Sequence, residues 1–245
     1  MKLALARKGG LLIPRRLRSL AKGVVSLLSP GTFKYQEEVG FWDGYLQSPE
    51  GLSANTHYEK TLLAISGESS KDFLAGKIIA DFGCGPAGSL CWATPARARI
   101  GIDVLADQYT KFNITSHDMV YVQSSEKHIP LPSNYVDVLF TMNAMDHVNY
   151  FATVCREIIR IIAPGGLFIG SFNLDEPPTF SEPQTLTEDL VSSSLLQYLE
   201  VQSYRIAPVG KSGNVYENFY LEKTPEDVGS HRILWVRARK PMKSA

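Results

Sequence analysis

A glycine-rich segment follows directly on a short apolar run, and this junction constrains the fold more than any other feature of the chain. Residues 77–82 read Lys-Ile-Ile-Ala-Asp-Phe, and residues 83–88 read Gly-Cys-Gly-Pro-Ala-Gly. A short apolar run bounded by glycine is typical of a buried strand, and glycines allow a tight turn that approaches a ligand closely. Ligands of open α/β sheets bind at the carboxyl ends of strands. We therefore expect a strand over 77–82 that ends in a binding turn.

The residues that follow alternate between strand and helix patterns. Further short apolar runs lie at 99–103, 119–122, 136–141 and 167–172. Residues 151–162 have helical spacing and end before Pro164-Gly165-Gly166, a strong stop signal. This succession predicts an α/β fold with a doubly wound, Rossmann-like parallel sheet and helices on both faces.

The C-terminal part has a different pattern. A helix is expected to open at Thr187, and long runs rich in Val, Tyr and Ile lie at 199–206 and 232–239. No helical pattern fills the gap between these two runs. An antiparallel pair at one edge of the sheet is therefore expected, rather than another parallel crossover.

The N-terminal part has an unusual charge distribution. Eight of the 25 basic residues lie in residues 1–36, which contain no acid, so 17 basic and 25 acidic residues remain in 37–245. Residues 1–32 are expected to be a basic arm. From Pro14 to Leu28 its apolar residues recur at helical spacing, which fits either a basic helix on a membrane surface or a solvated extension.

The domain after the arm is expected to span residues 33–245. We divide it into a helical entry segment at 33–76, a cofactor-binding core at 77–172, and C-terminal strands and acceptor loops at 173–245. Helices are expected over 33–48 and from Asn55 or Thr56 onward. The aromatic residues of the first helix either pack into the core or form part of a lid: Phe41, Trp42 and Tyr45.

Composition narrows the class of protein further. Hydrophobic residues make up 44% of the 245 residues, which is typical of a soluble globular domain. The three cysteines form no Cys-x-x-Cys pair, so neither a disulfide framework nor a cysteine zinc site is expected. A cytoplasmic location is therefore expected. Peripheral membrane contact through residues 1–28 is an open alternative. The acidic body argues against a nucleic-acid partner, because phosphate binding needs a basic surface.

Two carboxylates at strand ends indicate the chemistry of the ligand. Asp103 ends the second predicted strand, where a carboxylate can accept hydrogen bonds from both ribose hydroxyls of a nucleoside. NAD and S-adenosylmethionine share that ribose. Asp81, directly before the glycines, suits an α-amino group and a sulfonium but would repel a pyrophosphate. The two carboxylates together favour S-adenosylmethionine as the cofactor.

Four motifs in this order resemble those of class I S-adenosylmethionine-dependent methyltransferases, over residues 77–172. They are 81–85 (Asp-Phe-Gly-Cys-Gly), 99–103 (Arg-Ile-Gly-Ile-Asp), 135–138 (Tyr-Val-Asp-Val) and 161–166 (Ile-Ile-Ala-Pro-Gly-Gly). The resemblance implies a seven-stranded sheet whose last strand is antiparallel. The sequence departs from the family at Ala87, where a third glycine is common, and at Pro86, which restricts the loop. The stretch from Gly88 to Arg97 is short and contains Thr94-Pro95, so a brief or irregular helix is expected after the first strand.

The resemblance also implies roles for individual residues. Asp81, Gly83 and Gly85 would line the methionine part of the cofactor, and Asp103 would bind the ribose. Ser125 and Glu126, which stand where an Asp-Ala pair is common, would flank the adenine. Asn143 follows the fourth strand, where many members hold residues that face the methyl group, and we assign it to the cofactor site.

His147 is the candidate catalytic residue. Imidazole is a suitable base for a hydroxyl acceptor near neutral pH, and Asp146 is a candidate to orient it. The alternative is that His147 packs or caps the following helix. The other histidines show no metal-ligand spacing, so no metal is expected.

These observations predict methyl transfer to a small-molecule or glycan-like acceptor, or to a lipid-linked one if the arm binds a membrane, most simply at oxygen. Two alternatives remain open. One is a cofactor-binding fold without catalytic activity that serves as a scaffold, and the other is an NAD-dependent oxidoreductase. The sequence fixes neither the acceptor nor the oligomeric state.

Overall fold

The computed structural model describes residues 30–48, 54–209, 216, 219 and 231–242. The α-helices in these residues are α2 (Pro30–Tyr45), α4 (Ala54–Ser66), α5 (Phe151–Ile161) and α6 (Glu188–Ser194). The strands are β1 (Ile78–Phe82), β2 (Ala98–Asp103), β3 (Val120–Gln123), β4 (Val136–Met142), β5 (Ile162–Leu174), β6 (Glu200–Pro208) and β7 (Arg232–Arg239). Short 3-10 helices are η1 (Lys71–Leu74), η2 (Ala106–Phe112), η3 (Ile114–Ser116) and η4 (Leu196–Tyr198).

The strands form one sheet of seven, in the order β3-β2-β1-β4-β5-β7-β6. Neighbouring strands from β3 to β5 are parallel, whereas β7 pairs antiparallel with both β5 and β6. The predicted Rossmann-like sheet with an antiparallel last strand is therefore confirmed. The carboxyl ends of the parallel strands all lie at the same end of the sheet, which is where the predicted site residues lie.

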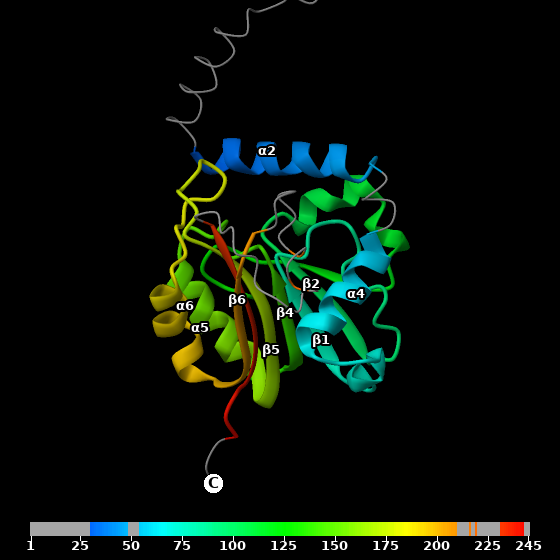
Figure 1. Cartoon of the computed structure of the whole chain (residues 1–245). Helices are drawn as coiled ribbons and strands as arrows, with labels where there is room; N and C mark the ends of the chain where they lie inside the picture. The colour runs from blue at the N-terminus through cyan, green and yellow to red at the C-terminus, as the bar shows by residue number, and fades with distance from the viewer. Residues whose placement is uncertain (1–29, 49–53, 210–215, 217–218, 220–230, 243–245) are drawn as a thin grey trace, which may run out of the picture.

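Helices cover both faces of this sheet (Figure 1). On one face, α5 buries Phe151, Val154, Cys155, Ile158 and Ile161, whose spacing of three and four places them along one side of the helix. This face joins α5 and α6 to the sheet in a single apolar cluster. On the other face, α4 contributes Leu62 and Ile65 to a second cluster with β1, β4 and β7.

The connection from β1 to β2 differs from an ordinary crossover. Residues 83–97 are all described and form turns without a helix, so even the brief helix expected there is absent. Gly83, Gly85 and Gly88 have positive φ, and Pro86 removes a backbone donor, so this segment cannot continue as a helix. Leu90, Trp92 and Ala93 of these turns are buried in the same apolar cluster as Leu62 and Ile65 of α4.

The observed boundaries of the other helices and strands agree with the predicted ones, with two exceptions. The fifth strand begins at Ile162, five residues before the predicted start, because the Gly165 amide bonds the Lys240 carbonyl at 2.8 Å. The first helix begins at Pro30, inside the predicted arm, and the rest of that arm lies outside the described residues. The helix expected at 187 is confirmed: the Thr187 side chain accepts a hydrogen bond from the Leu190 amide at the start of α6.

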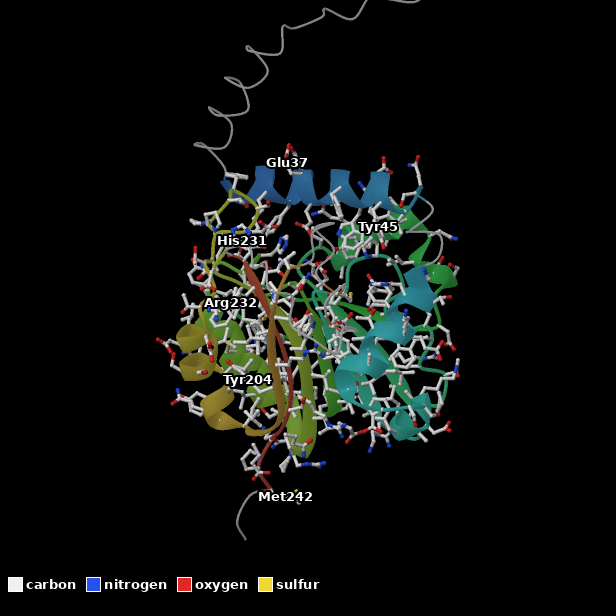
Figure 2. The ribbon with its side chains drawn as sticks, in the orientation of Figure 1. Glu37, Tyr45, Tyr204, His231, Arg232 and Met242 are labelled. Atoms are coloured by element: carbon white, nitrogen blue, oxygen red, sulfur yellow. The ribbon has the colours of Figure 1, made fainter. Side chains whose placement is uncertain are left out.

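Helix α2 lies across the end of the sheet where the parallel strands finish, above the rest of the molecule in Figure 1. In Figure 2 the Tyr45 side chain lies on the side of α2 that faces the body, and Glu37 projects from the opposite side. None of the helices in the described part of the chain is long and apolar enough to cross a lipid bilayer.

Candidate functional site

One cavity, with a volume of about 570 Å³, lies between α2 and the carboxyl ends of the strands. All eight residues predicted from the sequence line it: Asp81, Gly83, Gly85, Asp103, Ser125, Glu126, Asn143 and His147. They come from turns that are far apart in the sequence, and the parallel order of β3, β2, β1 and β4 brings these turns to the same edge. The sequence therefore identified residues of a single cavity.

Asp81 stands at the carboxyl end of β1 with 3% of its surface exposed. The Ser89 hydroxyl donates a hydrogen bond to Oδ2, whereas Oδ1 is buried and has no hydrogen-bond partner. Burial raises the pKa of this carboxyl to about 7, with a further contribution from the Asp103 charge and an opposing one from Ser89. A buried acceptor without a partner costs free energy, so this oxygen is suited to a ligand that brings a donor or a positive charge.

Asp103, at the end of β2, is held in one orientation by two backbone amides. Oδ1 accepts from the Leu105 amide at 2.8 Å, and Oδ2 accepts from the Gly85 amide at 3.1 Å. Burial raises the pKa of this carboxyl, and the amide bonds oppose that rise. A side-chain hydrogen bond with Tyr109 also contributes, and since a carboxylate has about four lone-pair sites it can still accept from a ligand hydroxyl.

Glycine is required in the turn after β1 for two reasons. Gly83 and Gly85 have φ values of 74° and 55°, in the left-handed region. A Cβ on Gly83 would lie 2.2 Å from the Ala144 Cβ, and a Cβ on Gly85 would lie 2.3 Å from the Trp42 ring. The turn is thus packed directly against α2, which links the entry helix to the predicted cofactor residues.

The contact at Gly85 yields a prediction. Replacing Gly85 by alanine is expected to destabilise the protein by about 2 kcal/mol, because it combines a left-handed backbone with a clash against Trp42. Urea unfolding followed by tryptophan fluorescence measures the change. In the control, Gly40→Ala on α2 meets nothing within 4 Å and is expected to have no destabilising effect. Equal stability of the Gly85→Ala protein and the wild type would mean that Trp42 does not pack against this turn.

Ser125 and Glu126 lie in the loop after β3. The Ser125 hydroxyl accepts from the Lys127 and His128 amides and so shapes the loop. Glu126 Oε1 accepts from the Tyr35 hydroxyl at 2.7 Å and from the Asn149 side chain. Glu126 therefore joins this loop to α2.

Asn143 follows β4 in a left-handed conformation with a φ of 47°. Its side-chain Oδ1 accepts from the Ser171 hydroxyl at 3.1 Å, and its backbone amide donates to the Ser171 carbonyl at 3.3 Å. These bonds tie the end of β4 to β5. The side chain lines the cavity with Met142 and Ala144.

His147 lines the same cavity and lies between carboxylates. Its Nδ1 is 3.3 Å from Glu38 Oε2, and its Nε2 is 3.9 Å from Asp146 Oδ1 and 3.7 Å from Glu182 Oε1. Burial lowers the pKa of the imidazole, but the interaction with Glu38 and the charges of Asp146 and Glu182 outweigh burial, and the net pKa is raised. The shortest separation from a carboxylate is to Glu38, whereas the sequence had suggested Asp146.

Sequence reasoning missed several residues that line the cavity: Lys34, Tyr35, Glu38, Tyr58, Asn173 and Glu182. The Lys34 ammonium donates to the His147 carbonyl. On a helix, charged residues are more often solvated than functional, so nothing in the sequence separates Lys34 and Glu38 from ordinary surface residues. The aromatic residues were a partial success, because Phe41 and Trp42 line the cavity.

The same cluster contains atoms that could hold a cation. One ligand atom each from Asp146, His147 and Glu182 lies within 4.8 Å of the others. Lys34 contributes a positive charge to this cluster. Burial lowers the pKa of its ammonium, and the nearby carboxylates of Glu126, Glu38, Asp146 and Glu182 offset only part of that lowering, so the net pKa is lowered. A protein cation therefore already balances part of the negative charge.

Comparison with known proteins gives a match to one family model over part of the chain and a shared fold. Residues 80–170 match the family model described as a methyltransferase domain. No curated protein matches the chain. Among solved structures, an S-adenosylmethionine-dependent methyltransferase from Aquifex aeolicus is 20% identical, with a TM-score of 0.52, and the match covers 80% of this chain and 95% of that one.

Two further structures have the same fold. An S-adenosylmethionine-dependent methyltransferase from Mesorhizobium loti is 15% identical with a TM-score of 0.54, over 70% of this chain and 98% of that one. A putative methyltransferase from Bacillus halodurans is 14% identical with a TM-score of 0.55, over 75% of this chain and 98% of that one. At these identities the structures establish the fold, while the family match rests on residues 80–170.

Proposed function

We propose that this chain, a class I S-adenosylmethionine-dependent methyltransferase by its fold and its family match over residues 80–170, methylates a hydroxyl group of a small-molecule or glycan-like acceptor. S-adenosylmethionine is the cofactor. The acceptor, the oxygen and the residue roles are the proposed part. The observation that carries the proposal is the position of His147, at the end of the same cavity that holds Asp81 and Asp103.

The residues at the β1 and β2 ends fit the cofactor. The buried Oδ1 of Asp81 has no hydrogen-bond partner, and it suits the α-ammonium group of a methionine moiety. The fixed carboxylate of Asp103 suits the two ribose hydroxyls. Glu126 and Ser125 lie further along the cavity, where we place the adenine.

The same geometry argues against a dinucleotide. Dinucleotide sites place the pyrophosphate at the N-terminus of the helix that follows the first strand. Here residues 83–97 contain no helix, and the carboxyl at the start of the turn would repel phosphate when ionised. An NAD-dependent oxidoreductase is therefore the weaker candidate.

At the acceptor end, the chemistry requires a base and a positioned oxygen. Bound S-adenosylmethionine supplies a methyl group on a positively charged sulfur that is already a good leaving group. Nε2 of His147 would accept the proton of the acceptor hydroxyl, whose oxygen would receive the methyl group that the cofactor supplies, with the sulfur keeping the electron pair of the broken bond. Positioning of the oxygen in line with this bond is the main task of the cavity.

Turnover with a panel of acceptors tests the proposal. The wild type is incubated with S-adenosylmethionine carrying a ¹³C-labelled methyl group and with matched hydroxyl, amine and thiol acceptors, including glycans. We expect S-adenosylhomocysteine and a hydroxyl acceptor with the label on oxygen. Labelling of amines alone would contradict O-methylation. Tight binding of S-adenosylhomocysteine with no labelled product from any class would favour the alternative of an inactive scaffold.

The pKa of Asp81 gives the cofactor affinity a pH dependence. An ammonium group binds the ionised carboxylate, and with a pKa of about 7 this carboxylate is mostly protonated at pH 6 and mostly ionised at pH 8. The affinity for S-adenosylhomocysteine is therefore expected to rise about tenfold between these pH values, as the ionised fraction does. Calorimetry across this range measures it. In Asp81→Asn the rise should disappear, and an unchanged rise would assign it to another group.

A further inference from the structure

We propose that Glu38, on α2, is the positioning residue for His147, so that the entry helix completes the acceptor-activating pair. This inference rests on the proposed function, because it assigns to His147 the role of base. It goes beyond that function by making a residue outside the family-matched segment part of the reaction.

The separations around the ring distinguish its two nitrogens. Nδ1 lies 3.3 Å from Glu38 Oε2, the shortest ion-pair separation around the ring, although the contact does not have hydrogen-bond geometry in this structure. Catalytic hydrogen bonds are often poorly aligned until a substrate binds. Nε2 lies 3.7 Å or more from the carboxylates beside it, which is longer than a hydrogen bond. A proton on Nδ1 directed to Glu38 leaves Nε2 neutral and able to accept a proton from the acceptor.

The other two carboxylates are held by different partners. Asp146 Oδ2 accepts from the Asn173 side chain at 3.2 Å, and Glu182 Oε2 accepts from the Thr179 hydroxyl at 3.2 Å. The second oxygen of Asp146, Oδ1, has no hydrogen-bond partner, but at 3.9 Å from Nε2 it is too far for a hydrogen bond to the ring. The charges of both carboxylates favour the imidazolium that forms when Nε2 takes the proton, whereas Glu38 selects the tautomer and fixes the ring.

Helix geometry explains how α2 reaches both ends of the cavity. Residues 35, 38 and 42 are three and four apart, so Tyr35, Glu38 and Trp42 share one face of α2. Tyr35 bonds Glu126 at 2.7 Å, and Trp42 packs on Gly85. These two contacts hold α2 against the residues that we assign to the cofactor, and Glu38 lies between them, opposite His147.

The charged groups that face His147 from each packed element are Lys34 and Glu38 of α2, the preceding Asp146, and Glu182 of the loop between β5 and α6. Burial raises the pKa of Glu38, but His147 and Lys34 together lower it by more than burial raises it. The net pKa of Glu38 is therefore lowered, while that of His147 is raised. The two shifts agree that the pair favours its charged form. Removing the Glu38 charge should therefore lower the pKa of His147.

The test is an NMR titration of His147 in the full chain, in which no acceptor is needed. Glu38→Gln keeps an oxygen that can accept from Nδ1 but removes the charge, so the ring stays in place. The pKa of His147 is expected to fall by about one pH unit. Asp43→Asn, which removes an exposed charge from the same helix, should leave that pKa unchanged.

Two further readouts separate positioning from a structural role. Glu38→Gln should stay folded, with a small loss of stability because the charged pair is lost, and should keep its affinity for S-adenosylhomocysteine, while the acid limb of the pH–rate profile moves to lower pH. An unchanged pKa of His147 in a folded Glu38→Gln protein would overturn the positioning role and leave the proposed function intact. Loss of turnover on chelation, restored by Mn²⁺, would also overturn it, because Nε2 would then be a metal ligand.

The failures of the two proposals can be told apart. If Glu38→Gln lowers the pKa of His147 but no hydroxyl acceptor is methylated, the pair is present and the proposed reaction is wrong. If hydroxyl acceptors are methylated and the pKa is unchanged, His147 is oriented by other groups.

Discussion

Replacing Asp103 by alanine is expected to weaken binding of S-adenosylhomocysteine by about 100-fold, because the cofactor loses two hydrogen bonds to a charged acceptor. The carboxylate is held in one orientation by the amides of Leu105 and Gly85, so little ordering is needed when a ribose binds. Calorimetry on purified protein measures the loss. Asp103→Asn keeps the shape but loses the charge, and we expect it to fall between the wild type and Asp103→Ala.

The matched control is Asp107→Ala, which removes an exposed carboxylate four residues further along the chain. Its affinity should equal that of the wild type. The unfolding midpoint of Asp103→Ala must also be measured, because the two backbone amides lose their acceptor. A folded Asp103→Ala protein with unchanged affinity would mean that the ribose lies elsewhere in the cavity.

Replacing His147 by alanine is expected to lower kcat by about 100-fold or more, the range typical of a lost general base. Affinity for S-adenosylhomocysteine should be unchanged, because none of the hydrogen bonds that hold Asp81 and Asp103 involves His147. The wild type should lose activity as the pH falls through a pKa above the usual range for histidine, since Glu38 and the neighbouring charges raise that pKa against burial. Steady-state rates with the acceptor found in the panel measure both effects.

His128→Ala provides the control for this prediction. His128 is also paired with a carboxylate, Glu157, at 2.9 Å, but it is exposed and does not line the cavity. Its removal should leave the rate and the pH profile as they are. Full activity of His147→Ala would show that His147 packs or caps the helix that follows it.

Much of the sheet could be predicted because its strands are separate apolar runs bounded by glycine, proline and other turn residues. The stop at Pro164-Gly165-Gly166 placed the end of α5 within a residue, and the runs at 199–206 and 232–239 became β6 and β7. The carboxyl ends of parallel strands meet at one edge, so knowing the strands was enough to bring Asp81, Asp103 and Asn143 together.

The parts that could not be predicted depend on packing between distant segments. The turns at 83–97 have no periodic pattern, and the sequence did not indicate that α4 would cover the face beside them. Helix α2 was expected, but its position across the cavity was not. Glu38 and His147 are 109 residues apart, and no local pattern links a carboxylate on one helix to a histidine in a distant loop.

The identity of the acceptor depends on the least patterned residues of the site. Lys34, Glu38, Asp146 and Glu182 surround His147 with charges of both signs, and a neutral hydroxyl compound is compatible with them. The expected membrane contact of residues 1–28 lies outside the described residues. It remains a prediction from the basic charge of the arm.

The central claim, that this cavity is built for S-adenosylmethionine, is tested most directly by calorimetry of the wild type with S-adenosylhomocysteine and with NAD⁺. We expect one site for S-adenosylhomocysteine, with an affinity that rises from pH 6 to pH 8, and no heat of binding for NAD⁺. Binding of NAD⁺ without binding of S-adenosylhomocysteine would contradict the account, because the Asp81 carboxyl and the helix-free turn after β1 would then be holding a pyrophosphate.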